Sequence, residues 1–284
     1  MLHTDLRQEI CRVGRSLFER GYVHATAGNI SVRLPEAQGF LITPTDACLG
    51  TLDPARLARL DDQGVQTGGD RASKTIALHR EIYRAAGQFD AQTGCVIHTH
   101  STHCVGVTLT SGHSAPGTDA TPAMELLPAL TPYFVMKVGH VPVIPYHRPG
   151  DPLAASWVAD VIEQYGQAGT PVRAVMLERL GPTVWHTNPS SAMALLEELV
   201  AVCRQAERFA CLVSLASAAA SCNNCAGAGL SNRSSICAAL TLTLPLSATP
   251  CCCAPCMTAR CNSSWPVRSS RSMPWAARSR SCRP

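Results

Sequence analysis

The chain lacks any apolar run long enough to cross a membrane. A spanning helix needs about 18 or more consecutive apolar residues. Every apolar run in this sequence is shorter than that and is ended by polar residues. The first 20 residues also lack the continuous apolar segment of a secretory signal, because charged side chains alternate with apolar ones at helical spacing. We therefore expect a cytoplasmic protein with no membrane partner.

Aspartate, glutamate, lysine and histidine are all missing from residues 211–284, which we name the tail. Its charged residues are seven arginines, and ten of the 15 cysteines of the chain lie in it. Residues 1–210 hold 17 basic and 20 acidic residues, which gives a net charge of −3. The basic balance of the chain is therefore a property of the tail, and no nucleic-acid partner is indicated for residues 1–210.

The cysteines of the tail do not form a metal motif of known spacing. The segments CNNC (222–225) and CCCAPC (251–256) have no accompanying histidine, and disulfides are rare in cytosolic proteins. A shifted reading frame of a GC-rich gene yields an excess of Ala, Arg, Ser, Pro and Cys of this kind. We expect one folded domain over residues 1–210, followed by a tail that is disordered or frameshifted.

Apolar patterns in residues 1–210 alternate between helical and strand periods. Ser73 and Asn188 stand where N-caps of two helices are expected. The alternation predicts a layered α/β domain. Helices are expected at residues 5–21, 53–61, 73–86, 151–166 and 188–210, and strands at 28–34, 39–45, 94–100, 134–146 and, with a turn between two strands, 174–186.

Two histidines end the apolar segment GCVIHTH. Residues i and i+2 of a strand point to the same face, so the imidazoles of His98 and His100 can meet one ion. Imidazole suits zinc and similar divalent metals. The alternative is a pair of solvated surface histidines, and the spacing alone does not decide between them.

Three short segments carry groups that bind anions. AGN (27–29) offers backbone amides and a side-chain amide, and TPT (43–45) offers hydroxyls in a turn. SK (73–74) lies at a helix N-terminus, where free N–H groups favour a phosphate. Each segment alone is explained as a turn or a cap, and together they predict a phosphate site.

The order of the motifs AGNIS, ITPT, SK and HTHSTHC resembles the class II aldolase family, over about residues 5–210. Within that family, PTDACLGTLDPARLA, ASKTIALH and TPYFVMKVGHVPVIPYHRPGD look most like the 3-oxo-tetronate 4-phosphate decarboxylases. The resemblance implies an α/β domain with a central, largely antiparallel sheet flanked by helices. It also implies a homotetramer whose sites lie between subunits.

The resemblance implies roles for particular residues. His98 and His100 are two of three histidine ligands of a divalent metal, usually zinc. Tyr146 falls where fuculose-phosphate aldolase places a tyrosine that acts across a subunit boundary. The residues implied to hold the substrate phosphate are Gly28, Asn29, Thr45, Ser73 and Lys74.

Three positions depart from the family pattern. Thr75 stands where a glutamate serves as acid or base, and Leu180, before Gly181, stands where the third metal histidine belongs. Asp46 replaces a glycine, and its charge would repel a phosphate unless the side chain turns away. Zinc catalysis normally takes three protein ligands, so one is missing. The histidines that remain to fill the gap are His103, His140, His147 and His186, and none of them lies at the matching position.

The resemblance implies a metal-dependent lyase that decarboxylates a 3-oxo-tetronate 4-phosphate to a triose phosphate and CO2, impaired here at Thr75 and Leu180. An aldolase or 4-epimerase acting on a phosphorylated keto-sugar is the alternative, because HTHSTHC resembles the aldolases equally. A non-catalytic family member or a damaged gene product is the second alternative, since the departures and the tail favour it.

Overall fold

The computed structural model describes the backbone of residues 3–35, 38–110 and 124–226. The chain divides into two units, Met1–Cys225 and Ala226–Pro284. The second unit lies almost wholly outside the described residues, and so does most of the tail, whose disorder stays an expectation. None of the described helices combines the length and the apolar character that a membrane span requires.

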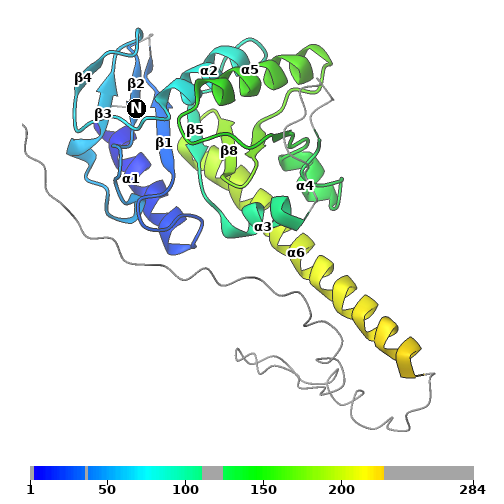
Figure 1. Cartoon of the computed structure of the whole chain (residues 1–284). Helices are drawn as coiled ribbons and strands as arrows, with labels where there is room; N and C mark the ends of the chain where they lie inside the picture. Colours follow the sequence, from blue (N-terminus) through cyan, green and yellow to red (C-terminus); the bar gives the residue numbers. More distant parts are fainter. Residues whose placement is uncertain (1–2, 36–37, 111–123, 227–284) are drawn as a thin grey trace, which may run out of the picture. The chain divides into compact units, whose positions relative to one another are not determined.

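The first unit alternates helices and strands (Figure 1). Its α-helices are α1 His3–Glu19, α2 Ile76–Ala86, α3 Thr102–Thr110, α4 Pro132–Lys137, α5 Pro152–Gln167 and α6 Pro189–Ala226, with short 3-10 helices η2 Leu49–Thr51 and η3 Pro54–Arg56. The strands are β1 Asn29–Arg33, β2 Phe40–Ile42, β3 Ala58–Leu60, β4 Gln66–Gly68, β5 Cys95–His98, β6 Val143–Ile144, β7 Ala174–Leu177 and β8 Gly181–His186.

The strands form one sheet in the order β4-β3-β2-β1-β5-β8-β7-β6. All neighbouring strands pair antiparallel except β6 and β7, which pair parallel. The α/β class and the largely antiparallel central sheet expected from the sequence are therefore confirmed.

The alternation of side chains along β1 and β5 separates two layers. Ile30 and Ile97 belong to a core shared with α1 and α6, whereas Val96 belongs to a second core shared with α2 and α5. Figure 1 shows α2 and α5 side by side. Because His98 follows Val96 by two positions and is the last residue of β5, its side chain faces the α2–α5 layer.

Two stretches differ from the sequence expectation. In residues 134–146, expected as strands, the first residues belong to α4, because Pro132 starts a helix and Thr131 caps it by accepting a hydrogen bond from the Phe134 N–H at 3.1 Å. Only β6 is extended there. In residues 53–61, the helix expected after the Asp53 cap ends at Arg56 as η3, and the chain continues as β3.

The observed ends of helices α2 and α6 agree only in part with the sequence expectation. Thr75, not Ser73, occupies the N-cap of α2, and Ser73 Oγ accepts a hydrogen bond from the Thr75 N–H at 3.4 Å. Asn188 caps α6 as expected, since its Oδ1 accepts from the Ser191 N–H at 2.9 Å. α6 itself continues past residue 210 to Ala226, so the first part of the tail is helical in its backbone.

Candidate active site

Asn29 and His98 lie opposite each other in the antiparallel pair of β1 and β5. Gly28 precedes them with a φ of +83°, and a Cβ at that position would lie 2.7 Å from Val23 Cγ1 and 3.0 Å from the His98 carbonyl oxygen. Only glycine fits such a left-handed and crowded position. The AGN turn therefore brings β1 against the end of β5 and sets Asn29 beside the histidine.

His98 and His100 lie together, with ring centroids 5.0 Å apart and an interplanar angle of 69°. β5 ends at His98, so the expected strand alternation does not extend to His100, which lies in the irregular segment between β5 and α3. His98 is buried, and its Nδ1 shares a hydrogen bond of 2.9 Å with the hydroxyl of Thr183 on β8. A hydrogen bond at one ring nitrogen fixes the orientation of the imidazole.

Burial makes both imidazoles weak bases. Desolvation lowers the pKa of His98 from 6.5 to about 3, with further lowering by His100 and His79. Desolvation, followed by the charge of His24, also lowers the pKa of His100. Both rings are therefore neutral near pH 7, and a neutral imidazole has a lone pair to offer a metal or a proton.

A cavity of about 120 Å³ brings most of the predicted site residues together. The start of α2, the ends of β5 and β7 and the segment that follows β6 all contribute to it. Its lining includes the predicted residues Asn29, Lys74, Thr75, His98, His100 and Leu180.

Four predicted residues lie outside that lining, among them Gly28 of the AGN segment. Thr45 borders a separate cavity of about 440 Å³. Ser73 is buried, and its backbone N–H donates to the Thr43 carbonyl at 3.3 Å. Tyr146 is 49% exposed, and its backbone N–H donates to Glu178 Oε2 at 3.1 Å. The turn with Thr45 is nevertheless adjacent to the start of α2, because Pro44 and Ala72 form a β-bridge.

Asp46 has a left-handed backbone, with a φ of +57°. This conformation explains physically why glycine suits the position in the family. The Asp46 side chain is exposed and borders the cavity of Thr45, not the cavity of the two histidines.

The residues present do not fit a complete zinc centre. Leu180 lines the cavity of His98 and His100. Gly181 after it has a φ of +139°, and a Cβ added there would clash with the Thr99 carbonyl oxygen at 2.0 Å. Over the described ranges, no group of three or more His, Cys, Asp or Glu is placed to hold a metal. Two imidazoles thus stand where a catalytic zinc normally has three protein ligands.

The cavity still leaves polar atoms for a ligand. Asn29 Oδ1 is buried without a hydrogen-bond partner among the described residues. A buried polar atom without a partner is costly, at about 1–3 kcal/mol. Such an atom beside Lys74 and the two histidines is expected where a polar substrate group binds.

Sequence reasoning gave no role to Glu178, although it lines the same cavity. This carboxylate is 4% exposed, accepts from the Tyr146 N–H and forms an ion pair of 3.3 Å with Arg179. The signal that could have found it is an acidic residue directly after the apolar strand AVML, because buried carboxylates are rare without partners.

The four spare histidines are separated by the fold. His103 contacts Glu207 at 2.6 Å, His140 contacts Glu125 at 3.0 Å, and His186 borders a different cavity near Trp185. His147 alone of these four lines the cavity of His98 and His100.

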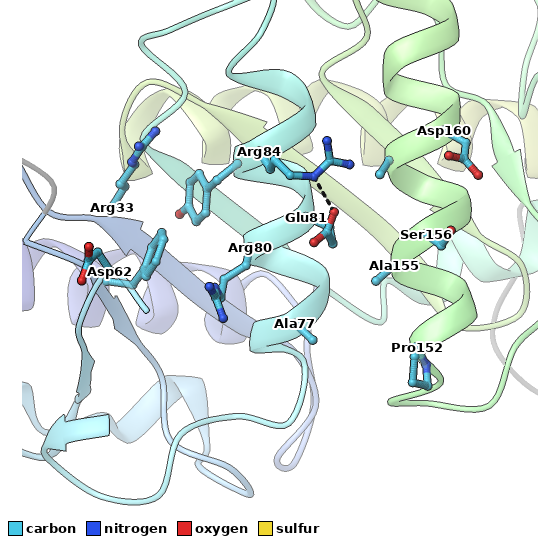
Figure 2. A pocket seen from close by; sticks show the side chains of 13 residues that line it. Arg33, Asp62, Ala77, Arg80, Glu81, Arg84, Pro152, Ala155, Ser156 and Asp160 are labelled. Atoms are coloured by element: carbon cyan, nitrogen blue, oxygen red, sulfur yellow. Dashed lines mark hydrogen bonds and ion pairs between the residues drawn. The ribbon is translucent and has the colours of Figure 1, made fainter. Parts of the chain in front are cut away.

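A larger cavity, of about 710 Å³, adjoins this one and shares Ala77, Pro152 and Ala155 with it. Figure 2 shows charged side chains of both signs around it, from α2, from α5 and from the segments near β1. Arg84 forms an ion pair of 2.7 Å with Glu81 there. The lining of this larger cavity contains none of the predicted site residues.

The chain belongs to the class II aldolase family. Residues 8–206 match the model of the Class II Aldolase and Adducin N-terminal domain, which is most of the chain. The fold and the paired histidines agree with that membership.

Individual relatives narrow the comparison. A 3-oxo-tetronate 4-phosphate decarboxylase from Cupriavidus necator is 52% identical over 196 residues, which cover 69% of this chain and 81% of the relative. A protein of the same name from Escherichia coli K12 is 34% identical, over 70% of this chain and 84% of the relative. The crystal structure of YgbL, a putative aldolase/epimerase/decarboxylase from Escherichia coli, superimposes with a TM-score of 0.60 at 31% identity, covering 72% of this chain and 89% of that one.

Proposed function

We propose that this chain is a lyase that decarboxylates a 3-oxo-tetronate 4-phosphate to a triose phosphate and CO2. The observation that carries the proposal is the 52% identity to a decarboxylase of that name, together with one cavity that holds Asn29, Lys74 and the two histidines. The family membership supports a carbon–carbon lyase, and the relative supports this substrate.

For decarboxylation, the residues of the cavity must bind the phosphate, stabilise the negative charge that develops and deliver a proton. The phosphate must be held, and Lys74 offers it an ammonium group beside the start of α2. The bond between the carboxylate carbon and C2 then breaks, CO2 leaves, and the electron pair stays on C2, C3 and the ketone oxygen as an enediolate. Donors such as the Asn29 amide stabilise the developing negative charge if they are already in place. Finally, a proton must reach C2.

Metal loading of the chain as it stands is expected to be weak. Class II aldolases are typically metal-dependent, and we propose zinc as the metal, held by His98 and His100. Leu180 cannot supply the third ligand that a catalytic zinc takes. We therefore expect slow turnover, and His98 and His100 contribute chiefly as neutral imidazoles.

We further place the protein in the cytoplasm as a homotetramer, on the strength of the family resemblance. Tyr146 supports an assembly of this kind, because its side chain is 49% exposed and lies outside the cavity of its own chain. An exposed aromatic side chain next to a cavity is available to a neighbouring subunit.

The test measures CO2 release from 3-oxo-tetronate 4-phosphate by the full chain, with and without added zinc. We expect slow release that zinc increases, and a further loss on His98→Gln, with His140→Gln as a matched control whose ring lies outside the cavity. Aldol cleavage of a phosphorylated keto-sugar, without CO2 release from the tetronate, would instead support the aldolase alternative.

A further inference from the structure

The cavity has no proton donor at the position where the family resemblance places one. Thr75 stands there, and its hydroxyl has no titration near neutral pH, so it cannot act as an efficient acid. Its Oγ1 is also engaged, at 2.9 Å from Ser73 Oγ. A decarboxylase must still protonate C2 after CO2 has left.

His147 lies in the same cavity as Thr75, His98 and His100. It comes from the segment between β6 and α5, whereas Thr75 precedes α2. The two residues thus contribute to one cavity from distant parts of the sequence. An imidazole is the side chain most often used for proton transfer near neutral pH.

The His147 ring is held in one orientation. Its Nδ1 lies 2.6 Å from the Pro145 carbonyl oxygen, and because a carbonyl only accepts, Nδ1 carries a proton. The ring also packs edge to face on Trp157, with centroids 4.4 Å apart and an interplanar angle of 84°. Nε2 is therefore the atom that gains and loses a proton, and it hydrogen-bonds to none of the residues that the structure describes.

We infer that His147 is the catalytic acid that protonates the enediolate, a role that rests on the proposed function. In its imidazolium form, Nε2–H gives its proton to C2 as the new C–H bond forms, and the enediolate becomes the ketone of the triose phosphate. The neutral ring then takes a proton from water. The Nδ1–H bond to Pro145 is compatible with both forms, so the ring need not turn during the cycle.

Three other groups in the cavity are less suited to the task. Burial lowers the pKa of both His98 and His100 and so reduces the protonated fraction available to an acid. Lys74 has the ammonium group that the substrate phosphate requires. His147 is the remaining imidazole in the lining. Because Lys74 and not His147 is assigned to the phosphate, replacing His147 tests proton transfer without removing the phosphate contact.

The experiment follows hydrogen exchange into the product ketone, dihydroxyacetone phosphate, incubated with the full chain in D2O. Enolisation of this ketone is the reverse of the protonation step, and it requires no decarboxylation. We expect His147→Gln to slow the exchange by at least about 10²-fold, the lower range for acid–base assistance. His140→Gln is the matched control and should exchange at the parent rate.

A second variant distinguishes a catalytic from a structural role. In a Thr75→Glu background the new carboxylate can transfer the proton, so His147→Gln should slow exchange much less there than in the parent. An equal loss in both backgrounds overturns the inference, as does unchanged exchange in His147→Gln. A lower zinc affinity of His147→Gln than of the parent, measured by titration, also overturns it, because the residue would then be a ligand.

The two proposals fail in different ways. If exchange depends on His147 but the parent releases no CO2 from the tetronate, the acid assignment stands and the decarboxylase assignment falls. If CO2 release occurs and the His147→Gln product, formed in D2O, carries deuterium on the carbon that was C2 of the tetronate, with the same stereochemistry and at the same rate as in the parent, His147 is not the acid.

Discussion

The hydroxyl groups of Thr75 and Ser73 lie 2.9 Å apart and share a hydrogen bond at the start of α2. Thr75 is the N-cap residue of that helix but makes no side-chain cap hydrogen bond. Its side chain lines the cavity of the two histidines. The position at which the family resemblance implies a glutamate therefore holds a short, neutral group that is hydrogen-bonded to its neighbour.

We expect Thr75→Glu to increase turnover when it is combined with Leu180→His. The carboxylate would restore acid–base assistance, worth about 10²–10⁴-fold. It would also sit at a helix N-terminus, where negative charge is favourable. The measurement is CO2 release by the parent, both single variants and the double variant, with Thr75→Gln in place of Glu as the neutral control. Equal rates for the Glu and Gln variants would exclude acid–base assistance at this position.

Leu180→His alone should raise the affinity for zinc. The residue lines the cavity of His98 and His100, so a third imidazole would complete the usual set of protein ligands. Loss of even an indirect partner of a metal ligand costs about 10–100-fold in affinity, so a gain of at least that size is expected. Isothermal titration with zinc measures it, and Leu180→Phe controls for filling the cavity. A parent that retains one zinc per chain through dialysis would contradict the prediction.

Sequence patterns predicted most of this architecture, and the reasons for the exceptions are local. β5 and α5 follow from clear periods and caps. His98 and His100 lie together as predicted, although His100 follows the end of the strand, so strand alternation is not the reason. Residues 134–137 were predicted as strand because Phe, Val and Met are apolar in either element, and the Thr131-Pro132 helix start decided the outcome. Strand and helix are hard to separate in short apolar runs.

Site residues that belong to a recognisable sequence motif could be predicted. Site residues that tertiary contacts bring in from distant parts of the sequence were harder to predict. His98 and Asn29 meet through the β1–β5 register, which motif order indicated. His147 and Glu178 reach the cavity from the segment after β6 and from the end of β7. No local pattern marks His147, and the acidic residue after the AVML strand marks Glu178 only as unusual. Tertiary packing brings both residues to the histidines.

Lys74→Met should weaken binding of phosphorylated substrates. A hydrogen bond to a charged group contributes about 1.5–3 kcal/mol, so KM should rise roughly 10–150-fold, at 1.4 kcal/mol for each tenfold change, while kcat changes less. Steady-state kinetics at fixed zinc concentration measure both constants. Arg80→Met is the matched control, because Arg80 lines the adjoining cavity shown in Figure 2 and not that of the histidines. Equal effects of the two variants on KM would argue for general electrostatics over a specific phosphate contact.

His79 should make the fold sensitive to acid. Its ring is fully buried, Nδ1 shares a hydrogen bond of 2.7 Å with Ser31 Oγ, and Nε2 has no partner among the described residues. Burial lowers its pKa from 6.5 to about 3. Between these two pH values His79 binds a proton in the unfolded chain but not in the folded chain. The free energy of unfolding therefore falls as the pH falls from 6.5 towards 3.

The slope of this effect can be measured on a His79→Gln variant. Each pH unit in that window corresponds to about 1.4 kcal/mol for one histidine, so lowering the pH from 6.5 to 5 should cost the parent up to about 2 kcal/mol more than the variant. Urea denaturation at pH 7 and pH 5 measures the difference, which is independent of any constant loss from the substitution itself. Between pH 7 and pH 8 both states are neutral at this residue, and parent and variant should change equally. The same loss from pH 7 to pH 5 in both proteins would show that His79 is protonated in the folded chain.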